Sequence, residues 1–439
     1  MCTRGWPAFI AMGASALFGS ATLLGSTPVA ASASPPGCSA TFTVVPSTNP
    51  GTSGNDLHAV AAIGAADVWA VGDSNGNTLL EHWNGTAWST VTGANLSSTP
   101  QVTTSFAGVL NAVAASGTSD VWAVGNSDLI EHWNGSAWST VASAGTSSTA
   151  LSGVWASGPN DAWIVGGTGS AGFEEHWNGT SWATSSGVDS ATTGWTSVSG
   201  SATGGVWAFG PSAPSNPTTN SMAAEHWDGT SWTSKAPNPN QVANSWGVPG
   251  GIADAGVSAT FIGDYAMPIN GNSPGNLNFQ MWNGATWTDI GGVGAQGPPD
   301  YALYGASAAA ANDVWFVGSD GAASTTSPGV ENPPEPFAEH YDGSQFTAVP
   351  SVDPNTTMPT NGSSTPDGQY NGVAAITGEV WAVGYSMDTS TGNDDTLIET
   401  ACLVPATDTP ETPTPVLLVP IALLGLGALL TLNRRRRIN

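Results

Sequence analysis

The chain has 439 residues, and its 32 Asp and Glu against 6 Lys and Arg give a formal net charge of −26 at pH 7. Nucleic acids bind through clustered Lys and Arg that release counterions, so this composition excludes them as partners. The 20 Trp and 56 Gly, with only 9% charged residues, favour an all-β fold over a helical one.

Residues 1–33 predict a secretory signal peptide. The segment begins with Arg4, continues through apolar and small residues from Trp6 to Leu24, and ends in the small-x-small sequence Ala31-Ser32-Ala33. A transmembrane helix is the competing interpretation, but Gly and Ser interrupt the apolar run. We therefore expect an exported chain that begins near residue 34.

An eight-residue pattern recurs along the chain and predicts a β-hairpin each time. Its central Asn-Gly or Asp-Gly is the strongest short hairpin signal, since a type I′ turn needs positive φ at both central residues. The copies are EHWNGTAW (81–88), EHWNGSAW (131–138), EHWNGTSW (175–182), EHWDGTSW (225–232), QMWNGATW (280–287) and EHYDGSQF (339–346).

Two further blocks precede each hairpin and complete a repeating unit of four antiparallel strands. One block resembles DVWAVG, and the other is an apolar stretch such as LHAVAAIG from Leu57. Units of about 40 to 50 residues built this way are typical of propeller blades, and seven can be counted. The sequence thus predicts an all-β, seven-bladed β-propeller at residues 34–403, which we expect to be monomeric.

The two ends of the repeat region complement each other. CSATFTVVPS from Cys38 matches DGSQFTAVPS from Asp342, while the seventh unit stops after its third strand at TLIETAC. An N-terminal strand is therefore expected to complete the last blade. Cys38 and Cys402 fall where a hairpin turn would join these strands, which predicts a disulfide that closes the ring and contributes about 4 to 5 kcal/mol.

Loop lengths distinguish the two faces of the predicted ring. Turns between the first and second strands are short, whereas connections between the second and third strands are long and irregular in blades four to seven. We call these the short-turn face and the loop-rich face, and we expect function on the loop-rich face.

One position inside the first strand varies while its neighbours repeat, and it is expected at the channel mouth on the loop-rich face. It reads His58, Asn111, Ser152, Thr196, Gly247, Tyr304 and Asn371. A polar ring with aromatic residues beside it could bind a small polar ligand such as a sugar, although a solvated rim is the alternative. The predicted ligand-binding residues are His58, Asn111, Trp195, Trp246, Tyr304 and Asn371.

No metal, cofactor or catalytic set is predicted. The repeated Glu-His pairs stand on different blades and diverge around the ring, so zinc ligation is disfavoured and a structural role is expected. Asp264 and Asp394-Asp395 could bind calcium, but they lack the spacing of an EF-hand loop. An extracellular carbohydrate-active enzyme remains the alternative, with a carboxylate pair such as Glu331 or Glu335 with Asp264.

The C-terminus predicts a membrane anchor. Residues 404–415 form a Pro/Thr-rich linker, 416–433 an apolar transmembrane helix, and 434–439 a basic cytoplasmic tail with four arginines. The linker resembles the stalk of sortase-anchored proteins, but residues 403–407 depart from the Leu-Pro-x-Thr-Gly motif. We expect a single-pass cell-membrane protein with its propeller outside.

The blocks from DVWAVG to EHWNGTAW resemble kelch and galactose-oxidase-type propeller repeats. Galactose oxidase implies a copper site with a cysteine-tyrosine crosslink, yet both cysteines of the exported chain are assigned to the disulfide. Sialidase propellers imply an arginine cluster, and the ring contains no Arg. The expected function is a surface binding or adhesion module for an extracellular glycan or protein. The acidic charge fits an acidic habitat or a cation-rich wall, or simply compositional drift.

Overall fold

A computed structural model of the protein describes most of the ring between residues 41 and 402. The described ranges are 41–94, 108–145, 150–169, 171–185, 192, 194–212, 222–237, 245–268, 276–291, 301–323, 331–352, 368–388 and 390–402. The predicted signal peptide, Cys38, the linker, the predicted transmembrane helix and the basic tail lie outside them. Within these ranges no helix has the length and apolar character that a membrane span requires.

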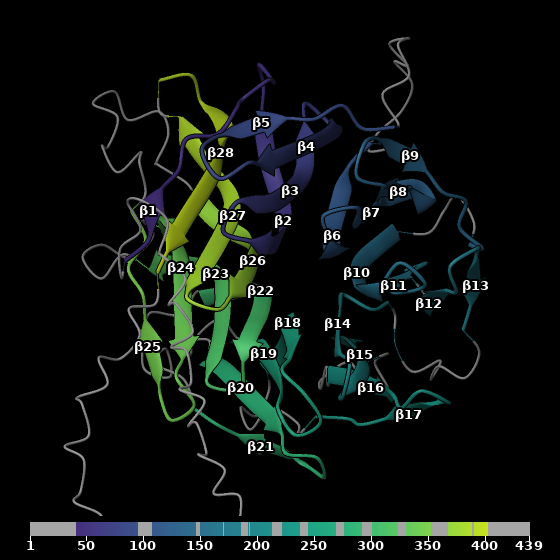
Figure 1. The fold of residues 1–439 in the computed structure, drawn as a ribbon. Helices are drawn as coiled ribbons and strands as arrows, with labels where there is room; N and C mark the ends of the chain where they lie inside the picture. The colour runs from purple at the N-terminus through teal and green to yellow at the C-terminus, as the bar shows by residue number, and fades with distance from the viewer. Residues whose placement is uncertain are drawn as a thin grey trace, which may run out of the picture. The chain divides into compact units, whose positions relative to one another are not determined.

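The described strands form seven four-stranded antiparallel sheets, each a blade (Figure 1). Blade one contains β2 (Asn55–Gly64), β3 (Asp67–Ser74), β4 (Asn77–Trp83) and β5 (Trp88–Thr90). Blade two contains β6 (Leu110–Gly117), β7 (Asp120–Gly125), the 3-10 turn η1 (Asn126–Asp128), β8 (Ile130–Trp133) and β9 (Trp138–Thr140). Blade three contains β10 (Ala150–Gly158), β11 (Asp161–Gly167), β12 (Gly172–Trp177) and β13 (Trp182–Thr184).

The remaining blades repeat this order. Blade four contains β14 (Ser197–Ser201), β15 (Gly205–Pro211), β16 (Met222–Trp227) and β17 (Trp232–Ser234). Blade five contains β18 (Ser245–Asp254), β19 (Thr260–Pro268), β20 (Asn276–Trp282) and β21 (Trp287–Asp289). Blade six contains β22 (Tyr301–Ala310), β23 (Asp313–Ala323), β24 (Glu331–Tyr341) and β25 (Phe346–Ala348). Blade seven contains β26 (Gly368–Ile376), β27 (Glu379–Asp388), β28 (Asn393–Ala401) and β1 (Thr43–Val44).

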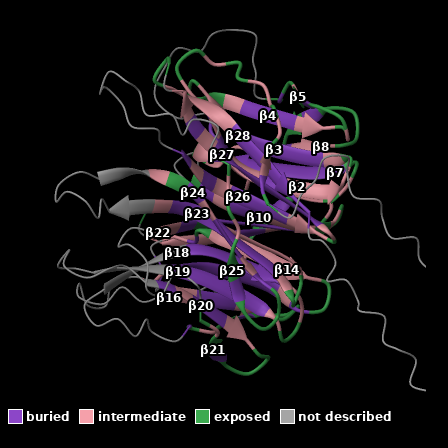
Figure 2. Ribbon diagram, turned by 90° about the vertical axis from the view of Figure 1, so that its left-hand side faces the viewer, coloured by how far each residue is buried: buried purple, intermediate pink, exposed green. Residues whose placement is uncertain are grey.

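Strand β1 closes the ring by pairing with β28, as the sequence predicts. Thr43 lies opposite Thr400 and Val44 lies opposite Glu399. The innermost strands then contact one another in a closed cycle from β2 through β6, β10, β14, β18, β22 and β26 back to β2. Buried residues follow the strands and exposed residues gather at the turns (Figure 2). The seven-bladed propeller is therefore confirmed.

Aromatic contacts join each blade to the next. Trp69 of β3 lies 5.1 Å from Trp133 and 5.2 Å from Trp138, both in the hairpin of blade two. The same contact recurs at Trp122, Trp163, Trp207 and Trp381. These tryptophans form the core between blades, as expected from their recurrence.

The histidines of the repeat have a structural role. His82 stacks on Trp69 with ring centroids 4.3 Å apart, and its Nε2 lies 2.8 Å from Asp67 Oδ1. Equivalent His-Asp pairs occur in blades two, three and six. In blade four Gly205 replaces the Asp, and His226 instead contacts the Gly204 carbonyl. Among the described residues no cluster of His, Cys, Asp and Glu could hold a metal ion.

The hairpins are confirmed, but the predicted type I′ turn at Asn-Gly is wrong. In blade one the Asn84 amide donates to the Ala87 carbonyl, so Gly85 and Thr86 are the central residues, and only Gly85 has positive φ, at 90°. Asn84 flanks the turn, and its Oδ1 accepts bonds from the amides of Thr86 and Ala87. The side chain caps the turn, which is why Asp replaces Asn in blades four and six.

A buried glutamate at the first position of the hairpin pattern joins blades one, two and three to the segment that follows the preceding blade's last strand. Glu81 accepts bonds from the amide and hydroxyl of Thr48, which follows β1. Glu131 accepts from the Ala94 amide after β5, and Glu175 from the Ser143 hydroxyl after β9. These carboxyls are fully buried. Each glutamate is thus hydrogen-bonded to the segment that leads out of the preceding blade.

We predict that Cys38 and Cys402 are bonded in the exported protein. The β1–β28 register places Cys402, which is 5% exposed, at the hairpin position that Asn84 occupies in blade one. Peptide mapping without reduction should recover one peptide pair that joins the two cysteines. Free thiols at both positions would contradict the pairing.

We predict that the ring is more stable at pH 5 than at pH 8. Burial raises the pKa of Glu81 and Glu379 to about 7, and that of Glu174 to about 8, from the ordinary 4.5. Each neutral carboxyl contributes about 1 to 3 kcal/mol to the free energy of unfolding. This contribution is complete below pH 4.5, the pKa in the unfolded chain, and is lost as the pH rises through 7 to 8. Calorimetry should show a falling melting temperature over this interval.

Glu81→Gln is the matched variant, because Gln280 occupies this position in blade five and is 1% exposed. It should melt with a smaller difference between pH 5 and pH 8 than the unsubstituted protein. A melting temperature that rises from pH 5 to pH 8 would contradict the assignment.

Candidate functional site

The variable residue of the first strand lies in a β-bulge, which explains why it can vary. In blade one the register shifts between Leu57 and Ala59, so His58 has no partner in the ladder. A glycine opposite makes room: a Cβ at Gly72 would lie 1.9 Å from the Asp56 carbonyl oxygen. Equivalent bulges place Asn111, Ser152, Gly250, Tyr304 and Asn371 at this position.

Blade five departs from the sequence alignment. Its bulge falls between Pro249 and Gly251, so Gly250 takes the position that the sequence assigned to Gly247. Gly247 pairs with Ala266 in the regular ladder. Blade four has no described bulge, and Thr196 stands just before β14 with its amide bonded to the Phe209 carbonyl.

The bulge residues of blades one, two, three, six and seven line one cavity of about 160 Å³ in the central channel. Four of the six predicted binding residues line it: His58, Asn111, Tyr304 and Asn371. Ser152 and Thr196 line it as well. Because the bulges lie near the start of each first strand, the cavity opens toward the loop-rich face.

The structure does not bring Trp195 to this cavity. Trp195 is 1% exposed, packs in the core beside Trp163 and Trp232, and donates its indole N–H to the Glu174 carboxyl. Burial raises the pKa of Glu174, the hydrogen bond from Trp195 lowers it, and the charge of Glu225 raises it further. Trp246 of β18 lies opposite Met267 of β19. Its side chain lies outside the part of the structure that is described.

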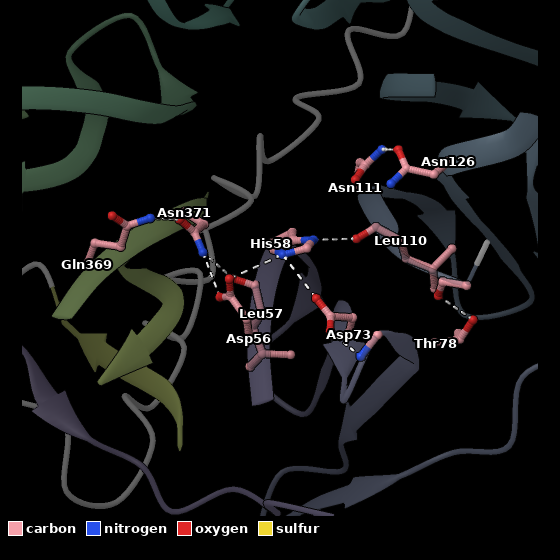
Figure 3. A network of polar contacts seen from close by, with 12 residues as sticks. Asp56, Leu57, His58, Asp73, Thr78, Leu110, Asn111, Asn126, Gln369 and Asn371 are labelled. Carbon is pink, nitrogen blue, oxygen red and sulfur yellow. Dashed lines mark hydrogen bonds and ion pairs between the residues drawn. The ribbon is translucent and has the colours of Figure 1, made fainter. Parts of the chain in front are cut away.

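Three of the lining side chains tie neighbouring blades together. His58 Nδ1 donates to the Leu110 carbonyl at 2.8 Å (Figure 3). Asn111 Nδ2 donates to the Leu151 carbonyl at 2.8 Å, and Asn371 Nδ2 donates to the Leu57 carbonyl at 3.0 Å. Each reaches the residue just before the bulge of the next blade. Blades seven, one, two and three are therefore joined at the channel by side chains.

Carboxylates surround His58. Its Nε2 lies 3.3 Å from Asp56 Oδ2 and 3.7 Å from Asp73 Oδ1. Burial lowers the His58 pKa, but the hydrogen bond and charge of Asp56, with lesser help from the Leu110 carbonyl and Asp73, raise it overall. Asn371 Nδ2 also donates to Asp56 Oδ1 at 2.8 Å and fixes that carboxylate.

The other half of the mouth is more open. Ser152 and Gly250 have short side chains or none, and the Thr196 hydroxyl bonds within its own blade to the Phe209 carbonyl. Tyr304 is 44% exposed, one of the few large apolar side chains so exposed in the described ring. The site thus combines an ordered acidic side with an accessible aromatic side.

The acids of the alternative enzyme reading lie elsewhere. Asp264 of β19 is 2% exposed and accepts a bond from Asn278 at 2.7 Å. Glu335 is exposed on β24, where it lies opposite Asp320. None of these residues lines the cavity.

No known protein family matches the chain, and no curated protein is similar to it. The fold is similar to that of solved propellers. YCF48 from Cyanidioschyzon merolae is 16% identical over 82% of this chain and 99% of its own, with a TM-score of 0.52.

Two further structures match to the same degree. U3-55K is 10% identical over 83% of this chain and 100% of its own, and the WD40 repeats of RRP9 are 10% identical over 83% and 98%; both have a TM-score of 0.52. At these identities the likeness shows the fold alone. It supports a propeller and not a kelch or galactose-oxidase relationship in particular.

Proposed function

We propose that this chain is an extracellular binding module that receives a protein partner at the channel mouth of its loop-rich face. One observation carries the proposal: the bulge residue differs between most blades, although the strands around it repeat. A residue that packs the core would be constrained by the repeat, as the tryptophans are. The bulge residues instead face a common cavity.

The size of the cavity favours a macromolecule that inserts one group. Pockets that enclose a whole small molecule measure about 300 to 1,000 Å³. At about 160 Å³ this cavity has room for one side chain, with the rest of the partner lying over the surrounding face.

A protein partner fits the site better than the glycan that the sequence first suggests. Sugar rings bind by stacking on exposed aromatic faces, and three aromatic residues were expected to supply them. Of the two whose side chains the structure describes, Tyr304 lines the cavity and Trp195 belongs to the core. Of the acids proposed for a carbohydrate-active enzyme, Asp264 and Glu335 do not line the cavity, and the side chain of Glu331 lies outside the described part of the structure.

Export and membrane anchoring complete the proposal and rest on the sequence. The signal peptide at 1–33, the linker at 404–415 and the helix at 416–433 would hold the propeller outside the cell. Protease added to intact cells is expected to cut the linker and release the ring. A chain truncated before Val416 that stays bound to membranes would contradict the anchor.

The binding role can be tested by panning a displayed library of linear peptides against the full chain, with a glycan array in parallel. Tyr304→Ala should weaken the selected peptides at least tenfold, because it removes the accessible ring at the cavity. The melting temperature should be unchanged, since this side chain is 44% exposed.

Val257→Ala is the matched control. Val257 is 62% exposed on the turn between β18 and β19, on the short-turn face, so its loss should leave binding intact. Peptides that bind the Tyr304 variant equally well would exclude the channel mouth. Glycans whose binding requires Tyr304 would replace the protein partner with a sugar.

A further inference from the structure

We propose that the group entering the cavity is a cationic side chain, Lys or Arg, of the partner. This inference rests on the proposed function and names the chemistry of its ligand. It follows from three observations: an accessible aromatic side chain lines the cavity, two carboxylates contact the lining residue His58, and the described propeller has a single Lys or Arg.

The aromatic feature is Tyr304. It stands in blade six, Asn371 in blade seven and His58 in blade one, and all three line the cavity. A Lys or Arg side chain can lay its methylene stem on an aromatic ring while its charged end continues to a carboxylate. The order of the three blades provides such a path from Tyr304 toward Asp56.

The carboxylates are Asp56 and Asp73, on either side of His58 (Figure 3). Even with His58 protonated, two carboxylates against one imidazolium leave a net negative charge. Their side chains are 29% and 24% exposed, so water and an incoming group can reach them. Asn371 holds Asp56 in place, so a cation would meet an already ordered acceptor.

The described part of the ring supplies no Lys or Arg to this site. Lys235 is the only Lys or Arg within the described ranges, and its Nζ lies 5.7 Å from the ring centroid of Trp282, between blades four and five. Nearby acids instead repel one another. Burial and the charges of Asp56 and Asp395 raise the Asp394 pKa. A cation at the mouth would relieve this repulsion, whereas an anionic group would add to it.

The test compares capped hexapeptides Gly-Ser-Gly-X-Gly-Ser, where X is Arg, Lys, norleucine, Gln or Glu, for binding to the full chain at 150 mM salt. Arg and Lys peptides should bind at least tenfold more tightly than those with norleucine or Gln, and the Glu peptide should show no binding. Asp56→Asn should remove most of the advantage, because the amide keeps the acceptor for Asn371 and loses the charge.

Asp342→Asn is the matched control, because it removes the same charge from an exposed turn on the short-turn face. Four other blades carry Asn at this position, so the fold accepts it. It should leave the preference for Arg and Lys unchanged. An equal loss in both variants would reduce the effect to attraction by net charge and overturn the proposal.

Different results would contradict the binding role of the channel mouth and the cationic nature of its ligand. If panned peptides require Tyr304 but carry no Lys or Arg, the channel mouth binds a partner and the cationic inference is wrong. If neither panned peptides nor the hexapeptides bind, both the inference and the proposed function fall.

Discussion

The contact on which the ring depends is an aromatic side chain of one blade's second strand packed against the hairpin of the next blade. Trp69 meets the hairpin of blade two, and Trp381 of blade seven meets the hairpin of blade one. Where tryptophan is lost, the contact persists: Phe261 lies 5.7 Å from Tyr341. No blade can bury this aromatic residue alone, so the blades are stable only as a closed cycle.

That requirement explains why β1 is so short and yet necessary. Trp315 of blade six needs a partner in blade seven, and the partner is Phe42, 5.7 Å away and fully buried, just before β1. Only two residues pair in the ladder, and the fully buried Phe42 adds apolar burial to their hydrogen bonds. The same segment continues to Thr48, which meets Glu81 of blade one.

Recurrence in the sequence predicted the number and order of the strands, but it predicted neither the type of hairpin turn nor the β-bulge. Blade number, hairpins and the closing strand follow from recurrence. Trp195 was misplaced because it adjoins Thr196 in sequence, although neighbouring strand residues point to opposite faces. Leu57, Leu110 and Leu151 occupy the position of Trp195 in other blades, and all three are buried. Alignment of Trp195 with these leucines would have predicted that it is buried too. The bonds from His58, Asn111 and Asn371 to the next blade depend on the bulge geometry, which no sequence spacing reveals.

The scarcity of cations links the stability of the ring to its site. Every ion pair among the described residues involves a histidine. Burial raises the pKa of Glu81 and Glu379, while the amide and hydroxyl that donate to Glu81 lower it less, so the net shift favours a neutral carboxyl and hence acidic conditions. A Lys or Arg within the ring could form ion pairs with these buried carboxyls as well as with the carboxylates at the channel mouth. Lys235, the only Lys or Arg of the described ring, lies beside Trp282, so the cation that we propose for Asp56 and Asp73 would come from another molecule.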